Sequence, residues 1–155
     1  MRLLDEKIKE KWKNYLWQSV GAGASLILVL ILFSDVINLF IVAAAGSTTF
    51  IVFALPNQKT ARPRNVIGGH AIGVLIGVLC IYISPTYLSG GLAVGISTLL
   101  MVSTDSEHPP AAGTALGLST LAIESSISSS LFILAAAVGL SIIRLGLLSR
   151  MENLM

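Results

Sequence analysis

Charged residues are scarce in this sequence: they make up 12% of its 155 residues, whereas hydrophobic residues make up 54%. An ordinary soluble domain carries about 25% charged residues. The mean hydropathy is +0.85. A water-soluble chain of this length would have too little polar surface to cover so much apolar material, but lipid accepts apolar side chains without penalty. The composition therefore excludes an ordinary soluble protein and predicts an integral membrane protein with one compact domain.

Cysteine and histidine are also scarce. Cys80 is the single cysteine, so an internal disulfide and a thiolate metal site are excluded. The two histidines lie 38 residues apart and are weak evidence for a metal site. No Gly-rich loop ends in Gly-Lys-Ser/Thr, which argues against ATP hydrolysis. We expect no catalytic residue, no metal, no cofactor and no nucleic-acid partner, and the chain is not expected to be an enzyme.

Apolar runs between polar residues predict the helices of an all-α bundle. We expect membrane segments over residues 15–33, 36–55, 66–83, 88–103, 111–123 and 127–148. A helix needs about 20 residues to cross the bilayer, so the segments 88–103 and 111–123 are short. Two arrangements stay open: six crossings, or four full spans with 111–123 re-entrant or part of a bent helix.

The first residues differ from the rest of the chain. Residues 1–13 hold eight of the eighteen Asp, Glu, Lys and Arg residues, and their apolar residues recur at helical spacing. This pattern predicts an amphipathic helix on the membrane surface over residues 1–14, followed by a transmembrane domain over residues 15–150. The predicted fold is thus a compact bundle of four to six transmembrane segments, including short or broken helices.

Basic residues are placed on one side of the six-crossing arrangement. That side contains the N-terminus, the 56–65 loop, the 104–110 loop and the C-terminus, and it holds all ten Lys and Arg residues. The opposite side holds Asp35 and Glu124. The positive-inside rule places the basic side in the cytoplasm. We therefore expect a protein of the cell (inner or cytoplasmic) membrane with a cytoplasmic N-terminus.

The most distinctive run is Glu107–Gly113, which reads EHPPAAG. Proline is favoured in the first turn of a helix, so Pro109 and Pro110 predict a helix start just after His108. The small residues that follow would leave backbone N–H groups bare, and such a helix end attracts anions. The alternative is a tight loop between two helices that needs no ligand.

A second run, residues 62–70, reads RPRNVIGGH. It predicts Asn65 as the N-cap of a helix, with Arg64 at the positive end and His70 about a turn and a half further in. Gly69 would let another helix or a ligand approach closely. Arginines facing lipid headgroups and glycines packing helices are the alternative explanation. For His70, a place in a transport pathway and a structural hydrogen bond are equally open.

Small residues interrupt two of the apolar segments. The run Gly46–Thr49 predicts either a helix break whose hydroxyls, from Ser47 and Thr48, line a cavity, or hydroxyls bonded to the preceding turn. Glycine recurs every four residues at positions 69, 73 and 77, which predicts close helix contact within the protomer or between copies. Short spans and Gly-rich faces leave little bulk to enclose a pathway, so we expect a homo-oligomer, a dimer or trimer.

These runs, in this order and separation, resemble the HPP family of membrane proteins, which is named for its His-Pro-Pro motif. The resemblance rests on residues 63–70 and 108–111, with Gly46-Ser47 and Phe53-Ala54 in support, and it extends over about residues 15–148. It implies a helical membrane domain, usually described with four transmembrane helices. Members in plant chloroplasts and cyanobacteria are associated with nitrite transport. The substrates of many bacterial members are unclear.

The residues and the resemblance together predict transport of a small inorganic anion, with nitrite the first candidate, not driven by ATP. The alternative is a non-transporting membrane anchor or sensor subunit. Asp105 and Glu107 would repel an anion unless a nearby base neutralises them. The expected partners are the lipid bilayer and the anion. The residues expected to bind the substrate or line its pathway are Arg64, Asn65, Gly69, His70, His108, Pro109, Pro110, Ser47 and Thr48.

The charge distribution predicts the topology directly. We expect single cysteines introduced at positions 59 and 106 to be protected from a membrane-impermeant reagent added outside intact cells. A cysteine at position 35 should be labelled. Labelling at 59 but not at 35 would reverse the orientation, and labelling at 153 would indicate an odd number of crossings.

Overall fold

The computed structural model describes residues 7–32 and 38–155, and over these residues it is helical with no strand. Its helices are α1 (Lys7–Leu32), α2 (Leu39–Ala54), α3 (Pro63–Cys80), α4 (Thr86–Ser103), α5 (Pro109–Ser119) and α6 (Ile123–Leu147). Two short 3-10 helices, η1 (Lys59–Ala61) and η2 (Leu148–Arg150), complete the described part. The prediction of an all-α bundle is confirmed.

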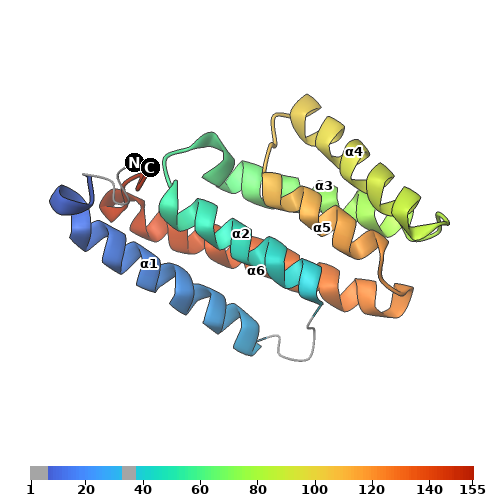
Figure 1. Ribbon diagram of the computed structural model, residues 1–155, viewed down its shortest axis with the longest axis horizontal. Coiled ribbons are helices and arrows are strands. Elements are labelled where there is room, and N and C mark those ends of the chain that lie inside the picture. The colour runs from blue at the N-terminus through green and yellow to red at the C-terminus, as the bar shows by residue number, and fades with distance from the viewer. Residues whose placement is uncertain (1–6, 33–37) are drawn as a thin grey trace, which may run out of the picture.

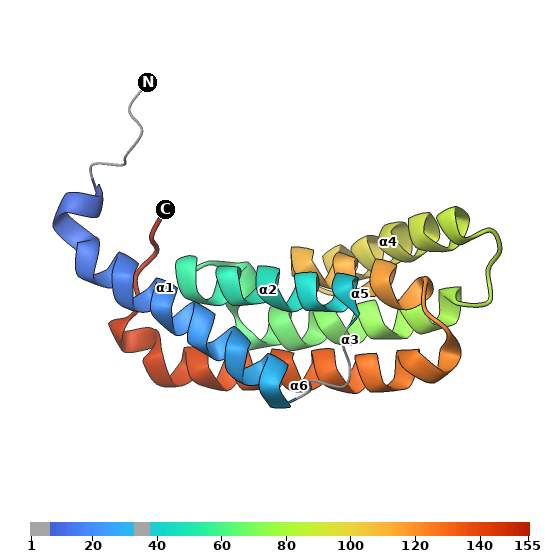
Figure 2. The same cartoon turned by 60° about the horizontal axis from the view of Figure 1, so that its bottom comes forward.

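Successive helices run in alternating directions along the long axis of the bundle (Figures 1 and 2). The N-terminal end of α1, the α2–α3 loop, the α4–α5 loop and the C-terminal tail therefore meet at one end. Ion pairs join them: Lys11 to Glu152 at 2.6 Å, and Lys59 to Glu107 at 3.0 Å. The segments that carry the basic residues are thus neighbours in space. We call this the basic end.

Four helices have the length and composition to cross a bilayer: α1, α3, α4 and α6. The apolar helix α2 has 16 residues and α5 has 11. At 1.5 Å per residue, α5 is about 17 Å long, roughly half the thickness of the hydrocarbon core. The bundle thus combines four full-length helices with two short ones, and the segment predicted to be short or re-entrant is the shortest helix.

The predicted N-terminal amphipathic helix falls partly outside the described residues, which begin at Lys7. From there the chain is helical and continues into the first apolar segment, with a non-helical residue at Lys11 (φ −116°, ψ 20°). Lys11 thus separates the first helical residues, 7–10, from the apolar part of α1. The predicted turn at Ser34 and Asp35 lies outside the described residues.

Helix α3 occupies the centre of the bundle and packs against α4, α5 and α6. Its closest partner is α5, because three glycines face it. A Cβ on Gly73 would lie 2.5 Å from the carbonyl oxygen of Ala111, and one on Gly77 would lie 2.8 Å from that of Ala115. The predicted glycine face is therefore a contact between two helices of the same protomer.

Helix α2 is continuous through residues 46–49, so of the two alternatives predicted for this run the helix break is wrong and the bonded hydroxyls are confirmed. The three hydroxyls of this run bond instead to the preceding turn. Ser47, Thr48 and Thr49 each donate to the carbonyl oxygen four residues earlier, at 2.9 Å. These bonds satisfy the hydroxyls inside an apolar helix, so this polar run does not interrupt it.

The start of α3 also differs from the prediction. Pro63 is the first helical residue and Arg62 is the N-cap, with an extended backbone (φ −66°, ψ 144°). A proline fits the first helical position, and it holds the residue before it in an extended conformation. Asn65 is therefore two residues inside the helix and is not its N-cap. Its side chain is buried and available for another contact.

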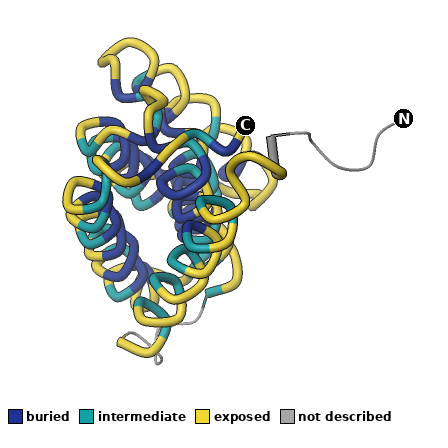
Figure 3. Tube along the Cα trace, turned by 90° about the vertical axis from the view of Figure 1, so that its left-hand side faces the viewer, coloured by how far each residue is buried: buried dark blue, intermediate teal, exposed yellow. Residues whose placement is uncertain are grey.

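Buried residues gather inside the bundle and exposed residues on its outer side (Figure 3). Helix α1 lies at the periphery (Figures 1 and 2) and packs mainly on α2. The C-terminal tail fastens it to the rest. Gln18 on α1 is fully buried, and its side chain accepts from the backbone N–H of Glu152 at 3.1 Å and donates to the carbonyl of Glu152 at 3.0 Å. The backbone N–H of Leu154 donates to the carbonyl of Ala54 at 2.9 Å.

The α3–α5 contact leads to a stability prediction. Gly73→Ala should force the two helices apart and lower the free energy of unfolding by about 1–3 kcal/mol. Gly91→Ala on α4 is the matched control, because nothing lies within 4 Å of the Cβ it would add. Thermal unfolding in mild detergent measures both variants. Equal midpoints for the two would contradict the proposed importance of this contact.

Candidate functional site

Two histidines that are 38 residues apart in the sequence lie side by side within the bundle. The ring centroids of His70 and His108 are 5.0 Å apart, with the rings at 63° to each other. Both residues are 0% exposed. The hydroxyl oxygen of Thr48 lies between them, 2.8 Å from His70 Nε2 and 3.0 Å from His108 Nε2. Three of the predicted site residues, from three different helices, therefore form one cluster.

The other nitrogen of each ring also has a partner. His108 Nδ1 lies 2.8 Å from the backbone oxygen of Thr60 in η1, and His70 Nδ1 lies 2.9 Å from the hydroxyl of Thr114 in α5. A carbonyl oxygen only accepts hydrogen bonds, so His108 Nδ1 carries a hydrogen. Both imidazoles are thus held at two points, which fixes their orientation.

The glycine face of α3 explains how His108 reaches His70. A Cβ on Gly69 would lie 2.7 Å from the Cβ of His108, so any other residue at 69 would displace His108. His108 is the N-cap of α5, and it sits beside a residue that is six positions inside α3. The N-cap of α5 is therefore buried in the bundle, whereas Pro109, its first helical residue, is exposed.

This helix start lacks the bare N–H groups predicted for it. Pro109 and Pro110 are the first two helical residues and have no N–H. The N–H of Ala111 donates to the carbonyl of His108 at 2.9 Å. The two prolines therefore start the helix without leaving unsatisfied N–H donors. The positive end of the helix dipole still points toward the imidazole of His108.

Ser47 does not join the histidines. It is exposed on α2 and lines a groove of about 600 Å³ between α2 and α5, together with Pro109, Pro110 and Gly113. The groove is otherwise apolar, with Phe40 and Phe50 on its walls. Pro110 is itself buried. The predicted pathway residues thus divide between a buried cluster and an apolar surface groove.

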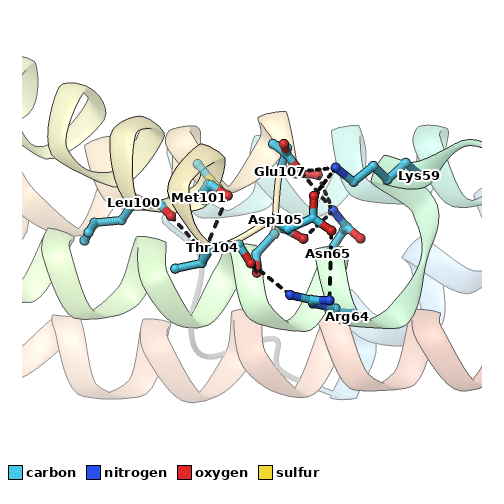
Figure 4. A network of polar contacts seen from close by, with 9 residues as sticks. Lys59, Arg64, Asn65, Leu100, Met101, Thr104, Asp105 and Glu107 are labelled. Atoms are coloured by element: carbon cyan, nitrogen blue, oxygen red, sulfur yellow. Dashed lines mark hydrogen bonds and ion pairs between the residues drawn. The ribbon is translucent and has the colours of Figure 1, made fainter.

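A second polar cluster lies at the basic end (Figure 4). Lys59 of η1 bonds to Asp105 and lies 3.0 Å from Glu107. Arg64 is exposed; its guanidinium donates to the carbonyl of Thr104 at 3.0 Å and lies 3.9 Å from Asp105. Both acids next to the His-Pro-Pro motif are therefore paired with bases.

Asn65 connects this loop cluster to α3. Its amide donates to the carbonyl of Glu107 at 3.2 Å and to that of Asp105 at 3.5 Å. It therefore holds the backbone of the α4–α5 loop just before His108. Arg64 and Asn65 act on the loop, and neither is among the hydrogen-bond partners of the histidine cluster.

The charges of the loop cluster shift one another's pKa values. Hydrogen bonds to Asp105 and Glu107 raise the pKa of Lys59. The hydrogen bond from Lys59 lowers the pKa of Asp105. The pKa of Glu107 is lowered by its own backbone N–H and then by Lys59. All three groups are therefore held in their charged forms.

Sequence reasoning missed three residues of this region. Thr114 has the only side-chain hydroxyl between Pro109 and Leu118, and that isolation was the available signal. Thr60 contributes a backbone oxygen, which no side-chain pattern reveals. Arg144 received no role, yet it is buried in α6 and its guanidinium donates to the carbonyl of Pro56, with Nε at 2.9 Å. It fastens α6 to the α2–α3 loop.

The histidine cluster is closed in this structure. Every buried side-chain nitrogen and oxygen of the described residues has a partner. The grooves described on α2 and α5 and between α1 and its neighbours are not lined by either histidine. Among the residues described, no group of three or more His, Cys, Asp or Glu side chains could hold a metal ion. The cluster can exchange protons along hydrogen bonds.

A family model described as "HPP, transmembrane region" matches residues 7–152 of the chain. No curated protein and no solved structure matches it. The match extends over all six helices and includes both the histidine cluster and the loop cluster.

The loop cluster leads to a pH prediction. The pKa values of Asp105 and Glu107 are lower in the folded state than their ordinary 3.8 and 4.5, so their ionised forms stabilise the fold above these values. This contribution is lost as the pH falls through the lowered values. Lys59→Met should therefore lower the thermal midpoint at about pH 7, and the difference from wild type should disappear at a pH below both lowered pKa values. Lys9→Met is the control. If Lys59→Met lowers the thermal midpoint by the same amount at both pH values, the ion pairs are contradicted.

Proposed function

The chain belongs to the HPP family of membrane proteins, and from that premise we propose that it carries a small inorganic anion across the membrane, with nitrite the first candidate. It is a transporter and not an enzyme. The absence of an ATP-binding motif favours transport along a gradient.

The buried pair His70 and His108 is the observation that carries this proposal. Ionisable residues inside membrane helices are rare and often mark substrate or proton pathways. Here two of them share one hydroxyl, and His108 sits at the positive end of α5. An anion beside this helix start would be stabilised by the dipole and by a protonated imidazole.

The basic end supports the same proposal. Lys59, Arg62 and Arg64 carry three positive charges against the two negative charges of Asp105 and Glu107, so an excess of one positive charge remains there. Such an excess raises the local concentration of anions. In this proposal the protein lies in the inner (cytoplasmic) membrane and its basic end faces the cytoplasm. Arg64 and Asn65 then lie at the cytoplasmic mouth of the pathway.

We also propose that the protein acts as a homo-oligomer, a dimer or trimer. The glycine face of α3 is used inside the protomer, so another surface must form this contact. The groove between α2 and α5, which exposes Ser47 and lies over the His-Pro-Pro motif, is one surface of suitable shape.

A second function, a non-transporting membrane anchor or sensor subunit, is favoured by one specific observation. The histidine cluster is fully buried and all its side-chain polar atoms are partnered, as expected of groups that only tie helices together. Ligand dependence separates the two functions. Millimolar nitrite should raise the thermal midpoint of a transporter over that in sodium chloride, and should leave an anchor unchanged.

Uptake by liposomes that contain only this protein tests the transport proposal. We expect nitrite uptake above that of protein-free liposomes. His108→Gln should slow it roughly tenfold, because losing one hydrogen bond to a charged group costs about 1.5 kcal/mol. Arg64→Gln should slow it less.

Lys13→Gln is the control for this experiment, because Lys13 lies on α1 away from the loop cluster and its contact is with Trp12. It should transport as the wild type does. If His108→Gln and Arg64→Gln both fold with normal oligomer size and both transport nitrite at the wild-type rate, the proposed pathway is contradicted. That result would favour the anchor.

A further inference from the structure

One chain of hydrogen bonds crosses the centre of the bundle, and we call it the histidine chain. It consists of five contacts, four between buried residues and one to the half-buried Thr60. They are Thr114 Oγ1 to His70 Nδ1 at 2.9 Å, His70 Nε2 to Thr48 Oγ1 at 2.8 Å, Thr48 Oγ1 to His108 Nε2 at 3.0 Å, His108 Nδ1 to the oxygen of Thr60 at 2.8 Å, and Thr48 Oγ1 to the oxygen of Ala44 at 2.9 Å.

Each of these five contacts needs one hydrogen, but neutral side chains supply four. Each threonine hydroxyl contributes one, and each neutral imidazole contributes one. His108 must donate to the Thr60 carbonyl, so in the neutral ring its Nε2 carries no hydrogen. Thr48 donates to the Ala44 carbonyl, His70 Nε2 donates to Thr48, and Thr114 donates to His70 Nδ1. The contact between Thr48 and His108 Nε2 is left without a hydrogen.

A fifth hydrogen completes the chain without moving any heavy atom. Placed on His108 Nε2, it donates to Thr48, which then accepts from both histidines while its own hydrogen stays on the Ala44 carbonyl. All five contacts are then hydrogen bonds. Placed on His70 Nδ1 instead, the hydrogen would leave the Thr114 hydroxyl without an acceptor and one contact at Thr48 empty. The geometry therefore fits one added proton, on His108.

An added proton at His108 brings a positive charge that the protein itself does not balance. Helices α2, α4 and α5 carry no charged residue. The charged groups on the other elements around the chain are Lys59 of η1, Arg64 of α3, and Glu124 and Arg144 of α6. Glu124 is in the first turn of α6, at the end opposite Arg144, and the loop acids Asp105 and Glu107 are paired with Lys59.

The start of α5 adds to this imbalance. His108 caps the positive end of that helix, where a second positive charge is unfavourable. A buried charge without a partner is strongly destabilising, whereas a paired one is tolerated. A proton on His108 and an anion beside it would therefore each favour the binding of the other, and this coupling is reciprocal.

We propose that the histidine chain is a proton-binding site, which takes up one proton on His108 together with one transported anion, so that the protein is an electroneutral proton–anion carrier. This inference rests on the proposed function. One proton and one anion enter and leave together, so no net charge moves and the membrane potential does not oppose anion uptake. Thr48 is a positioning residue, because its single oxygen accepts from both histidines only in the protonated state.

Liposomes with a trapped pH-sensitive dye test the coupling. We expect protein-dependent nitrite uptake to acidify the lumen, with one proton for each nitrite, and to be insensitive to a potassium diffusion potential set with valinomycin. Protein-free liposomes measure the nitrous acid that crosses the lipid unaided, and their signal is subtracted. Nitrite uptake that follows the membrane potential without acidification would overturn the coupling while leaving anion transport intact. No protein-dependent uptake at all would overturn the transport function itself.

Adjacent threonines provide matched variants. Thr48→Val keeps the shape of the side chain and removes the bridging oxygen, so it should lower both proton and nitrite uptake at least tenfold. Thr48→Ser should retain most of both. Thr49→Val is the control: Thr49 is also buried and bonded to the turn before it, but it does not touch the histidines. Equal proton-to-nitrite ratios and rates in Thr48→Val and Thr49→Val would contradict the role of the chain.

A spectroscopic test is independent of transport. Nitrogen-15 NMR of labelled wild-type protein should show, without nitrite, His70 protonated on Nε2 and His108 on Nδ1. Adding sodium nitrite in place of sodium chloride at constant pH should increase the doubly protonated form of His108. No change in either ring on adding nitrite would overturn proton–anion coupling at this site.

Discussion

The close approach of α3 and α5 is the constraint on which the rest of this structure depends. Lipid offers no hydrophobic force between helices, so packing and hydrogen bonds hold them together. Gly69, Gly73 and Gly77 let the backbone of α5 lie directly on α3. This contact brings His108, the buried N-cap of α5, beside His70. A larger side chain at position 69 would displace His108 and so separate the histidines.

Polar groups within this bundle are satisfied at two levels that differ in their exposure to water. The loop cluster of Lys59, Asp105 and Glu107 lies at the surface, where charges are screened and pairs contribute little. The histidines lie below it in a dry environment, where each unpaired polar atom would be costly. Asn65 links the two levels, because it holds the loop that leads to His108. A change of charge in the loop therefore reaches the histidines through the backbone and not through direct contact.

Several features of the fold and site followed from the sequence, each for an identifiable reason. The long apolar runs predicted the membrane helices because lipid-exposed segments need them. The glycine spacing predicted a helix contact because residues four positions apart lie on the same face of a helix. Asn65 was misplaced as an N-cap because Pro63 starts the helix two residues earlier. The expectation of bare N–H groups at Pro109 and Pro110 failed because the same prolines that start a helix also lack the donors.

The sequence by itself determined that the chain lives in a bilayer, that its basic residues group in a few loops, and that His70 and His108 lie next to helix starts. These are properties of composition and of local spacing. The tertiary structure decided that the two rings meet, that Thr48 bridges them, and that Thr60 and Thr114 occupy their remaining nitrogens. The two rings and their partners come from four elements, α2, η1, α3 and α5, that are distant along the chain. A hydrogen bond depends on positions within a few tenths of an ångström, which local patterns do not encode.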